Sequence, residues 1–292
     1  MARRYRRVTL IHNAKAGAAD HEGSVLVRLI ERAGRQVKHF RYKHCDLAEA
    51  LKRPADLVAI AGGDGTVAKV AAHCHPDGPP IAILPLGTAN NLAKSLGIYG
   101  APEDLIAGWA AGELRPFHPI DAEGPWGRRR LVEGLGLGAF AEALALLPRR
   151  PGFTGARTVF ADLVTTALPE RLAIRIGGET LDGGFVLLEA ATIPLVGPNL
   201  PLAAAADPAR RKFAVSFIGE DGDEREALAR WIAAGGEGAA PVSFRTAAAA
   251  TIEGRFRRVR LDGHLWEGSL ADDTAARIVL SAEERPLHFL GP

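Results

Sequence analysis

Residues 57–71 constrain the fold of this chain more than any other stretch. Five apolar residues at 57–61 run directly into the segment GGDGT at 62–66. Apolar residues then recur at helical spacing at 67, 70 and 71. This order predicts a buried strand, a tight loop and the first turns of a helix. Such a loop suits a phosphate group, because glycine permits close backbone approach and the amides at a helix N-terminus attract anions.

A second stretch with the same order follows at residues 81–98. Residues 81–84 are apolar and predict another buried strand, which leads into the segment PLGTANN at 85–91. Apolar residues at 92, 93 and 96 predict the helix that comes next. Two such loops, one strand–helix unit apart, can converge at the same edge of a parallel sheet, where ligands bind.

The two loops together resemble the diacylglycerol kinase family, which includes bacterial lipid kinases and sphingosine kinases and shares a superfamily with NAD kinases. Its members carry a GGDGT loop and a PLGTxND-like loop at this separation. The resemblance implies transfer of the γ-phosphoryl group of ATP to a lipid hydroxyl with the help of Mg²⁺. It also implies a two-domain plan with the nucleotide in the cleft. The resemblance is specific over residues 8–100 and looser afterwards.

Hydrophobic patterns divide the chain near Pro116. Before this point, strand and helix patterns alternate, which predicts an α/β fold with a doubly wound, mostly parallel sheet. Strands are predicted at residues 8–13, 37–42, 57–61 and 81–84, and helices at 25–33, 47–51, 67–71, 92–96 and 102–111. The first strand ends in Asn13, and Gly17 closes the turn after it. We therefore predict a nucleotide-binding kinase domain over residues 1–115.

After residue 115, short strand patterns are separated by glycine and proline turns, which predicts a mostly antiparallel, β-sandwich-like domain over residues 116–292. Strands are predicted at residues 120–122, 131–137, 172–176, 185–191, 213–218, 242–245, 259–261 and 278–280. Helical patterns interrupt them at 158–168 and 223–234. We expect this β-rich half to take the substrate.

The composition narrows the classes of function. A net charge of +2 argues against a dedicated nucleic-acid binder, and the two cysteines favour a reducing cytoplasm over a disulfide framework. No apolar run approaches the length of about 18 residues that spans a membrane. We expect a cytoplasmic protein that has no transmembrane segment and meets its lipid substrate at the membrane surface. The sequence does not decide whether the chain forms a homodimer.

The two loops supply most of the candidate binding residues. Phosphoryl transfer needs backbone donors for the phosphates, a divalent cation and an acceptor for the substrate proton. The residues predicted to bind the nucleotide are Asn13, Gly62, Gly63, Asp64, Gly65, Thr66, Gly87, Thr88 and Asn90. Lys15 and Lys94 either reach a phosphate or are ordinary surface lysines.

Each of two aspartates has two possible roles. Asp64 is a candidate catalytic residue, or it caps a helix and holds the loop, as aspartate often does. The resemblance places Asp121 at an acidic position of the family that helps to organise Mg²⁺, so Asp121 is the candidate metal ligand. As a single aspartate after a strand, Asp121 could equally be a turn residue.

The segment Asp262-Gly263-His264 departs from the family, which usually has Asp-Gly-Glu. The family's glutamate is taken as the base that accepts the lipid hydroxyl proton, and His264 stands at its position. An imidazole can also accept a proton near neutral pH, so His264 is a candidate catalytic residue. The alternative is a histidine in the turn of a β-hairpin.

Other departures keep two further functions open. Ala68-Lys69 replaces the family's Asn-Glu, Asn91 replaces an aspartate, and Glu133 replaces an asparagine. The family's Asp-Gly, which is linked to a structural metal, has no clear match; Asp207 is the nearest. The loss of three family carboxylates supports the alternative of a nucleotide- or lipid-binding protein with impaired catalysis, and Asp262 with His264 argues against it. NAD kinase is the other alternative, although the PLGTAN segment favours the lipid branch.

Overall fold

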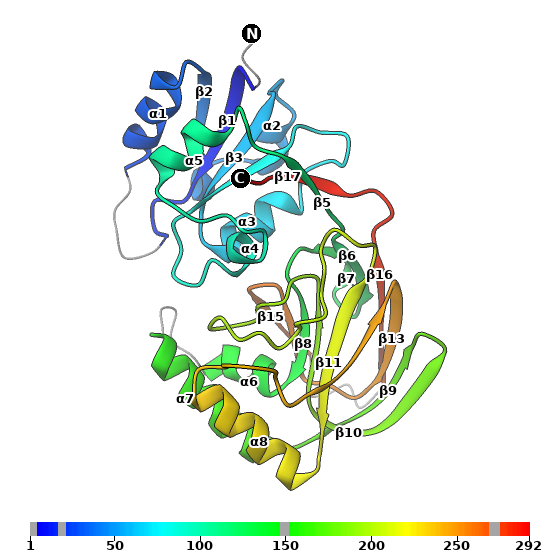
Figure 1. The fold of residues 1–292 in the computed structure, drawn as a ribbon. Helices are drawn as coiled ribbons and strands as arrows, with labels where there is room; N and C mark the ends of the chain where they lie inside the picture. Colours follow the sequence, from blue (N-terminus) through cyan, green and yellow to red (C-terminus); the bar gives the residue numbers. More distant parts are fainter. Residues whose placement is uncertain (1–4, 17–21, 147–151, 269–274) are drawn as a thin grey trace. The chain divides into compact units, whose positions relative to one another are not determined.

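The computed structural model describes residues 5–16, 22–146, 152–268 and 275–292, and it separates into two compact units (Figure 1). The first unit combines Met1–Phe117 with Arg285–Pro292, and the second is His118–Glu284. Gly17, predicted to close the first turn, lies outside the described residues. The functions predicted for residues 1–115 and 116–292 stay predictions.

A six-stranded sheet forms the centre of the first unit, in the order β2-β1-β3-β4-β17-β5. All its neighbouring strands run parallel except β5, which is antiparallel to β17. Its strands are β1 (Arg7–His12), β2 (Gln36–Arg41), β3 (Leu57–Gly62), β4 (Ile81–Pro85), β5 (Leu114–Phe117) and β17 (Leu287–Leu290). The predicted α/β class with a mostly parallel sheet is therefore confirmed.

Both faces of this sheet are buried, as a doubly wound fold requires. Leu10 of β1 and Ala59 of β3 pack with Ile30 and other apolar residues of the first unit, whereas the neighbouring Ile11 and Ile60 are equally buried and point the other way. The helices are α1 (Gly23–Arg32), α2 (Leu47–Leu51), α3 (Asp64–Ala71), α4 (Asn91–Ser95) and α5 (Pro102–Gly108), with a short 3₁₀ turn at Tyr42–His44. Each predicted helix of this half is present.

An 11-stranded sheet forms the second unit, and all its strand pairs are antiparallel. Its strands are β6 (Ile120–Gly124), β7 (Gly127–Leu131), β8 (Gly134–Gly138), β9 (Glu170–Ile176), β10 (Glu179–Ala191), β11 (Phe213–Gly219), β12 (Ser243–Ala247), β13 (Ala249–Gly254), β14 (Arg258–Leu261), β15 (His264–Glu267) and β16 (Ala276–Ala282). The predicted antiparallel class of this half is confirmed, and a single curled sheet provides it.

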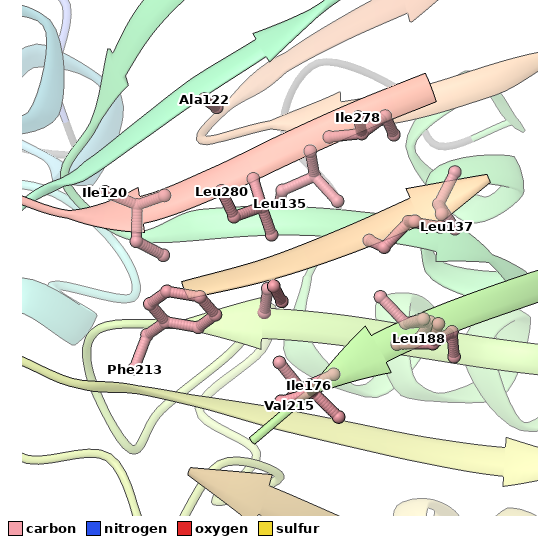
Figure 2. Close-up of a cluster of buried hydrophobic side chains, with 14 of the residues drawn as sticks. Ile120, Ala122, Leu135, Leu137, Ile176, Leu188, Phe213, Val215, Ile278 and Leu280 are labelled. Atoms are coloured by element: carbon pink, nitrogen blue, oxygen red, sulfur yellow. The ribbon is translucent and has the colours of Figure 1, made fainter. Parts of the chain in front are cut away.

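Figure 2 shows the core on one face of this sheet, a cluster to which β8, β10 and β16 contribute Leu135, Leu188 and Leu280, although these strands are far apart in the sequence. On the other face lie α6 (Ala139–Leu146), α7 (Phe153–Thr166) and α8 (Gly222–Ala233). Side chains of β11 alternate between the two faces: Val215 joins the first core, whereas Ala214 packs with the helices.

One predicted strand of this half is wrong. The sequence predicts a single strand over residues 131–137, but β7 ends at Leu131 and β8 begins at Gly134. The chain turns between them because the amides of Val132 and Glu133 donate to the side chain of Asp262. Among the described residues, no helix is long and apolar enough to cross a membrane.

Candidate functional site

The two glycine loops of the first unit meet backbone to backbone. Gly62 ends β3 and pairs with Pro85 at the end of the parallel strand β4, so both loops leave the same edge of the sheet. A Cβ atom built on Gly87 would lie 2.4 Å from Cα of Gly63, and one built on Gly63 would lie 3.0 Å from Cα of Gly87. Both positions therefore need glycine for close approach rather than for a left-handed backbone.

Asp64 ties the second loop to the first. It is the first residue of α3, and its Oδ1 accepts a hydrogen bond of 2.9 Å from the amide of Leu92 in α4. Burial raises the pKa of Asp64, and the amides of Leu92 and Asn91 counteract that rise. Asp64 therefore links the two loops through this hydrogen bond. Its catalytic role stays a prediction.

Asn90 shapes the second loop from within. Its backbone is left-handed, with φ of 51°. Its Oδ1 accepts from the amide of Gly87 at 2.9 Å, and its Nδ2 donates to the carbonyl of Gly87 at 2.8 Å. The amides of Gly87 and Thr66 are thereby engaged within the protein, since Thr66 N donates to Gly63 O. Space beside Gly65 is open, with no heavy atom within 4 Å of a Cβ built there.

Asn13 connects these loops to a cavity. Its Nδ2 donates to Thr66 Oγ1 at 2.8 Å, so the end of β1 joins the GGDGT loop. The cavity has a volume of about 550 Å³ and lies at the ends of β1 and β2. Its charged lining is mostly basic, with Lys15, Arg41 and Lys43 against one acid, Glu22. This lining suits an anionic ligand beside the loops.

His39 also lines this cavity, on β2. Burial lowers the pKa of His39, and the nearby charge of Arg41 lowers it further. Its ring centroid lies 5.6 Å from that of His12 at the end of β1. The ring of His39 therefore adds a neutral aromatic surface to the cavity near pH 7, beside the cationic lining residues.

Asp121, the predicted metal ligand, lies on β6 of the second unit and is paired with an arginine. Nε of Arg128 donates to both carboxylate oxygens at 2.8 Å, and Nη2 of Arg128 also contacts Oδ2. Within the described ranges, no group of three or more His, Cys, Asp or Glu side chains is arranged to hold a metal ion. The metal role of Asp121 stays a prediction.

The segment 262–264 forms the turn from β14 to β15. Asp262 is buried, its φ is 51°, and its Oδ1 accepts from the amides of Val132, Glu133 and Gly134 at 3.1, 2.8 and 3.0 Å. Burial raises the pKa of Asp262, and these amides counteract the rise. Asp262 therefore acts as a scaffold that joins the β14–β15 turn to the start of β8.

His264 is exposed and pairs with Leu261 across this hairpin. The adjoining strand β14 contributes to a buried ion pair that the sequence analysis missed. Arg260 donates through Nη1 to the carbonyl of Asp262 at 2.9 Å and through Nη2 to Glu189 Oε2 at 2.6 Å. The available signal was a glutamate inside the apolar run 185–191, because a buried charge requires a partner.

Comparisons with known proteins agree with the loop motif. Residues 7–122 match the model of the diacylglycerol kinase catalytic domain. The chain is 30% identical over 154 residues to a Stenotrophomonas maltophilia protein named "Probable lipid kinase YegS-like", covering 49% of each chain. It is 40% identical over 60 residues to a diacylglycerol kinase of Bacillus subtilis, covering 20% of this chain and 19% of that one. The matches thus span about half the length of these relatives or less.

A solved structure extends the likeness to the whole chain. A diacylglycerol kinase from Bacillus anthracis superposes with a TM-score of 0.70 and 16% identity, covering 99% of this chain and 97% of that one. At this identity the likeness shows the fold alone. The resemblance first seen in the two loops is confirmed by the family model, and the two-part fold is that of the structural relative.

Proposed function

We propose that this chain, whose residues 7–122 belong to the diacylglycerol kinase catalytic domain family, is an ATP-dependent lipid kinase that transfers the γ-phosphoryl group to a lipid hydroxyl. The observation that carries the proposal is the contact of Gly63 with Gly87 at the carboxyl ends of β3 and β4. Phosphoryl transfer depends mainly on positioning and charge neutralisation, which two interlocked loops at a helix N-terminus provide.

The nucleotide is proposed to lie across the GGDGT loop and the neighbouring cavity. The phosphates approach the open space beside Gly65, at the start of α3. The remaining nucleotide enters the cavity of about 550 Å³ beyond Asn13, which is within the size range of small-molecule sites. Lys15 and Arg41 on its wall counter the negative charge.

Mg²⁺ is proposed to accompany ATP. It keeps several waters and is usually bound by one or two carboxylates together with substrate phosphates, so a dedicated protein cage is unnecessary. The chemistry of the loop fits this requirement, because Asp64 places a carboxylate beside the glycines. When bound, the ion neutralises charge on the phosphates; Asp121 is the second candidate ligand.

His264 is proposed as the base that accepts the lipid hydroxyl proton. Asp262 is poorly suited to that role, because its Oδ1 accepts three backbone hydrogen bonds. His264 stands two residues further on, exposed at the start of β15. The scaffold formed by Asp262 and Arg260 holds the turn that presents the imidazole.

A phosphate-transfer assay tests this function. Purified protein is incubated with Mg²⁺ and γ-labelled ATP, and with diacylglycerol, a sphingoid base or NAD as acceptor. We expect label in a lipid and none in NAD, and Gly63→Val should abolish both transfer and ATP binding. Formation of NADP without lipid phosphate would support the NAD kinase alternative instead.

A nucleotide-binding protein with impaired catalysis is the second candidate. The ion pair of Asp121 with Arg128 favours it, because this carboxylate is already neutralised. Saturable binding of ATP without transfer to any acceptor, in protein that shows a cooperative thermal transition, would establish this candidate and refute the kinase.

A further inference from the structure

A second cavity lies in the second unit, at the opposite end of β8 from the Asp262 turn. Gly134 at the start of β8 contacts Asp262, whereas Gly138 at its end lines the cavity. The cavity has a volume of about 720 Å³ and is bounded by the end of α7, the start of β9 and the turn between β13 and β14. No residue proposed above for catalysis or nucleotide binding lines it.

The end of α7 forms the apolar wall of this cavity, with Leu163, Ala167 and Leu168. Leu168 is 87% exposed, more than any other large apolar side chain among the described residues. Arg225 of α8 fixes this wall, because its guanidinium donates to the carbonyls of Val164, Thr165 and Ala167. Binding of an apolar ligand is favourable at such a wall, because the ligand displaces water from the exposed leucine.

The remaining lining of the cavity carries charge. Arg171, Arg255 and Arg257 line it together with the carboxyl groups of Glu142 and Glu170. Glu142 is already paired with Arg258, whose Nη1 lies 2.5 Å from Glu142 Oε2, and Arg171 with Glu220 at 3.2 Å. Arg257 is exposed and belongs to neither of these ion pairs, so its positive charge faces the cavity lining without being part of them.

Glu170 adds a hydrogen-bond donor to this lining. Its Oε2 is buried and has no hydrogen-bond partner among the described residues. Burial, assisted by the nearby charge of Glu142, raises the pKa of Glu170 to about 8. The group is therefore a neutral carboxylic acid at pH 7, and its O–H can donate to an anionic oxygen in a short, charge-assisted bond.

We propose that this cavity binds the anionic head group and adjoining methylenes of a single-chain amphiphile, such as a fatty acid or a lipid phosphate monoester. Arg257 and the O–H of Glu170 hold the anionic oxygens, and the alkyl chain lies along Leu163 and Leu168. None of the residues proposed for catalysis or nucleotide binding lines this cavity, and the proposal does not depend on the proposed kinase activity.

Isothermal titration calorimetry on the full chain tests the site, with octanoate, decanoate and decyl phosphate below their micelle-forming concentrations and decanol as the neutral probe. We expect saturable binding of the anions and an affinity gain of up to about fourfold per added methylene. Decanol should bind at least about tenfold more weakly than decanoate. Comparison of decanoate with decyl phosphate identifies the preferred head group. Saturating MgATP should leave these affinities unchanged, so failure of the kinase proposal would not affect the result.

Variants assign the binding to named groups. Arg257→Ala should weaken decanoate binding about tenfold, whereas Arg129→Ala, at an exposed arginine of β7 outside the cavity, should leave it unchanged. Glu170→Gln keeps a neutral donor and should bind like the parent at pH 7. Parent binding should weaken as pH rises through about 8, because ionised Glu170 repels the ligand, and the Gln variant should lose this dependence.

Three outcomes would overturn the site. They are the absence of saturable binding by the parent, equal affinity for decanol and decanoate, and unchanged binding by Arg257→Ala. The pH comparison is made with decanoate, which stays ionised across the range. Glu142 is held by Arg258, and the facing guanidinium groups keep their charge, so Glu170 is the group in this lining that titrates near pH 8.

Discussion

The carboxylate of Asp64 accepts a hydrogen bond of 2.9 Å from the amide of Leu92, which lies 28 residues later in the chain. This bond joins the start of α3 to the first turn of α4 and holds the second loop against the first. One partly buried aspartate thereby has two roles in the proposed kinase, since it links the two loops and also places a carboxylate beside the proposed phosphate site.

Substitutions of Asp64 separate these roles. Asp64→Ala leaves the buried amide of Leu92 unsatisfied and should lower the free energy of unfolding by about 1–3 kcal/mol. Asp64→Asn retains an acceptor oxygen and should cost less, yet it removes the charge and should reduce lipid phosphorylation as strongly as Ala does. Urea unfolding and the transfer assay measure the two effects. Normal turnover by the Asn variant would contradict a catalytic role.

Gly87 and Gly65 form a matched pair of glycine substitutions. Gly87→Ala places a Cβ 2.4 Å from Cα of Gly63, so the loops must separate, and we expect a loss of about 1–3 kcal/mol in stability together with loss of ATP binding. Gly65→Ala meets no heavy atom within 4 Å and lies inside α3, where alanine is favoured by about 0.5–1 kcal/mol. Thermal unfolding and ATP titration compare them; equal stability of the two variants would refute the close contact.

Local sequence patterns predicted the first unit well. Residues 47–51 form the predicted helix α2, whose N-cap Asp46 accepts from the amides of Ala48 and Glu49. The run at 57–61 is apolar enough to specify β3, buried at every position. The convergence of the two loops followed from their positions at the ends of neighbouring strands.

Contacts between distant residues could not be predicted in this way. β17 (Leu287–Leu290) inserts beside β4, some two hundred residues earlier in the chain, and a four-residue strand carries too little periodicity to indicate its partner. The break between β7 and β8 depends on Asp262, which is 130 residues from Val132. The partner of Glu189 is likewise set by the register that brings β8 between β10 and β14.

Removing one partner of the buried pair of Arg260 and Glu189 should lower the stability of the protein strongly, whereas replacing both with apolar residues should lower it much less. Glu189→Gln leaves the Arg260 charge without its carboxylate in the interior and should cost about 3–5 kcal/mol of stability. The double change Glu189→Leu with Arg260→Met removes both charges and should recover much of that loss. Chemical denaturation of the parent, the single variant and the double variant decides this, and a double variant less stable than the single one would contradict it.

Glu170 should make stability depend on pH without any ligand. Its pKa is raised from 4.5 to about 8 in the folded protein, so the folded state holds a proton that the unfolded chain has released. The stabilising effect is complete below pH 4.5 and is lost as pH rises to 8, at up to about 1.4 kcal/mol per pH unit. Glu170→Gln should remove this slope in urea unfolding between pH 5 and 8. Parallel curves for the two proteins would show that Glu170 ionises normally.

The proposed base, His264, gives the sharpest test of the kinase chemistry. Lipid hydroxyls are weak acids, and a positioned base contributes about 10²–10⁴-fold to such a reaction. His264→Ala should lower turnover by that factor and leave ATP affinity unchanged, because His264 is not among the residues that line the cavity proposed for the nucleotide. His264→Glu should restore much of the activity and extend it to lower pH, since a carboxylate remains an acceptor where an imidazole is protonated.

His288→Ala, at a partly buried histidine of β17, is the control and should keep the pH profile of the parent. Parental turnover by His264→Ala would make His264 a turn residue and leave Asp64 as the base to test.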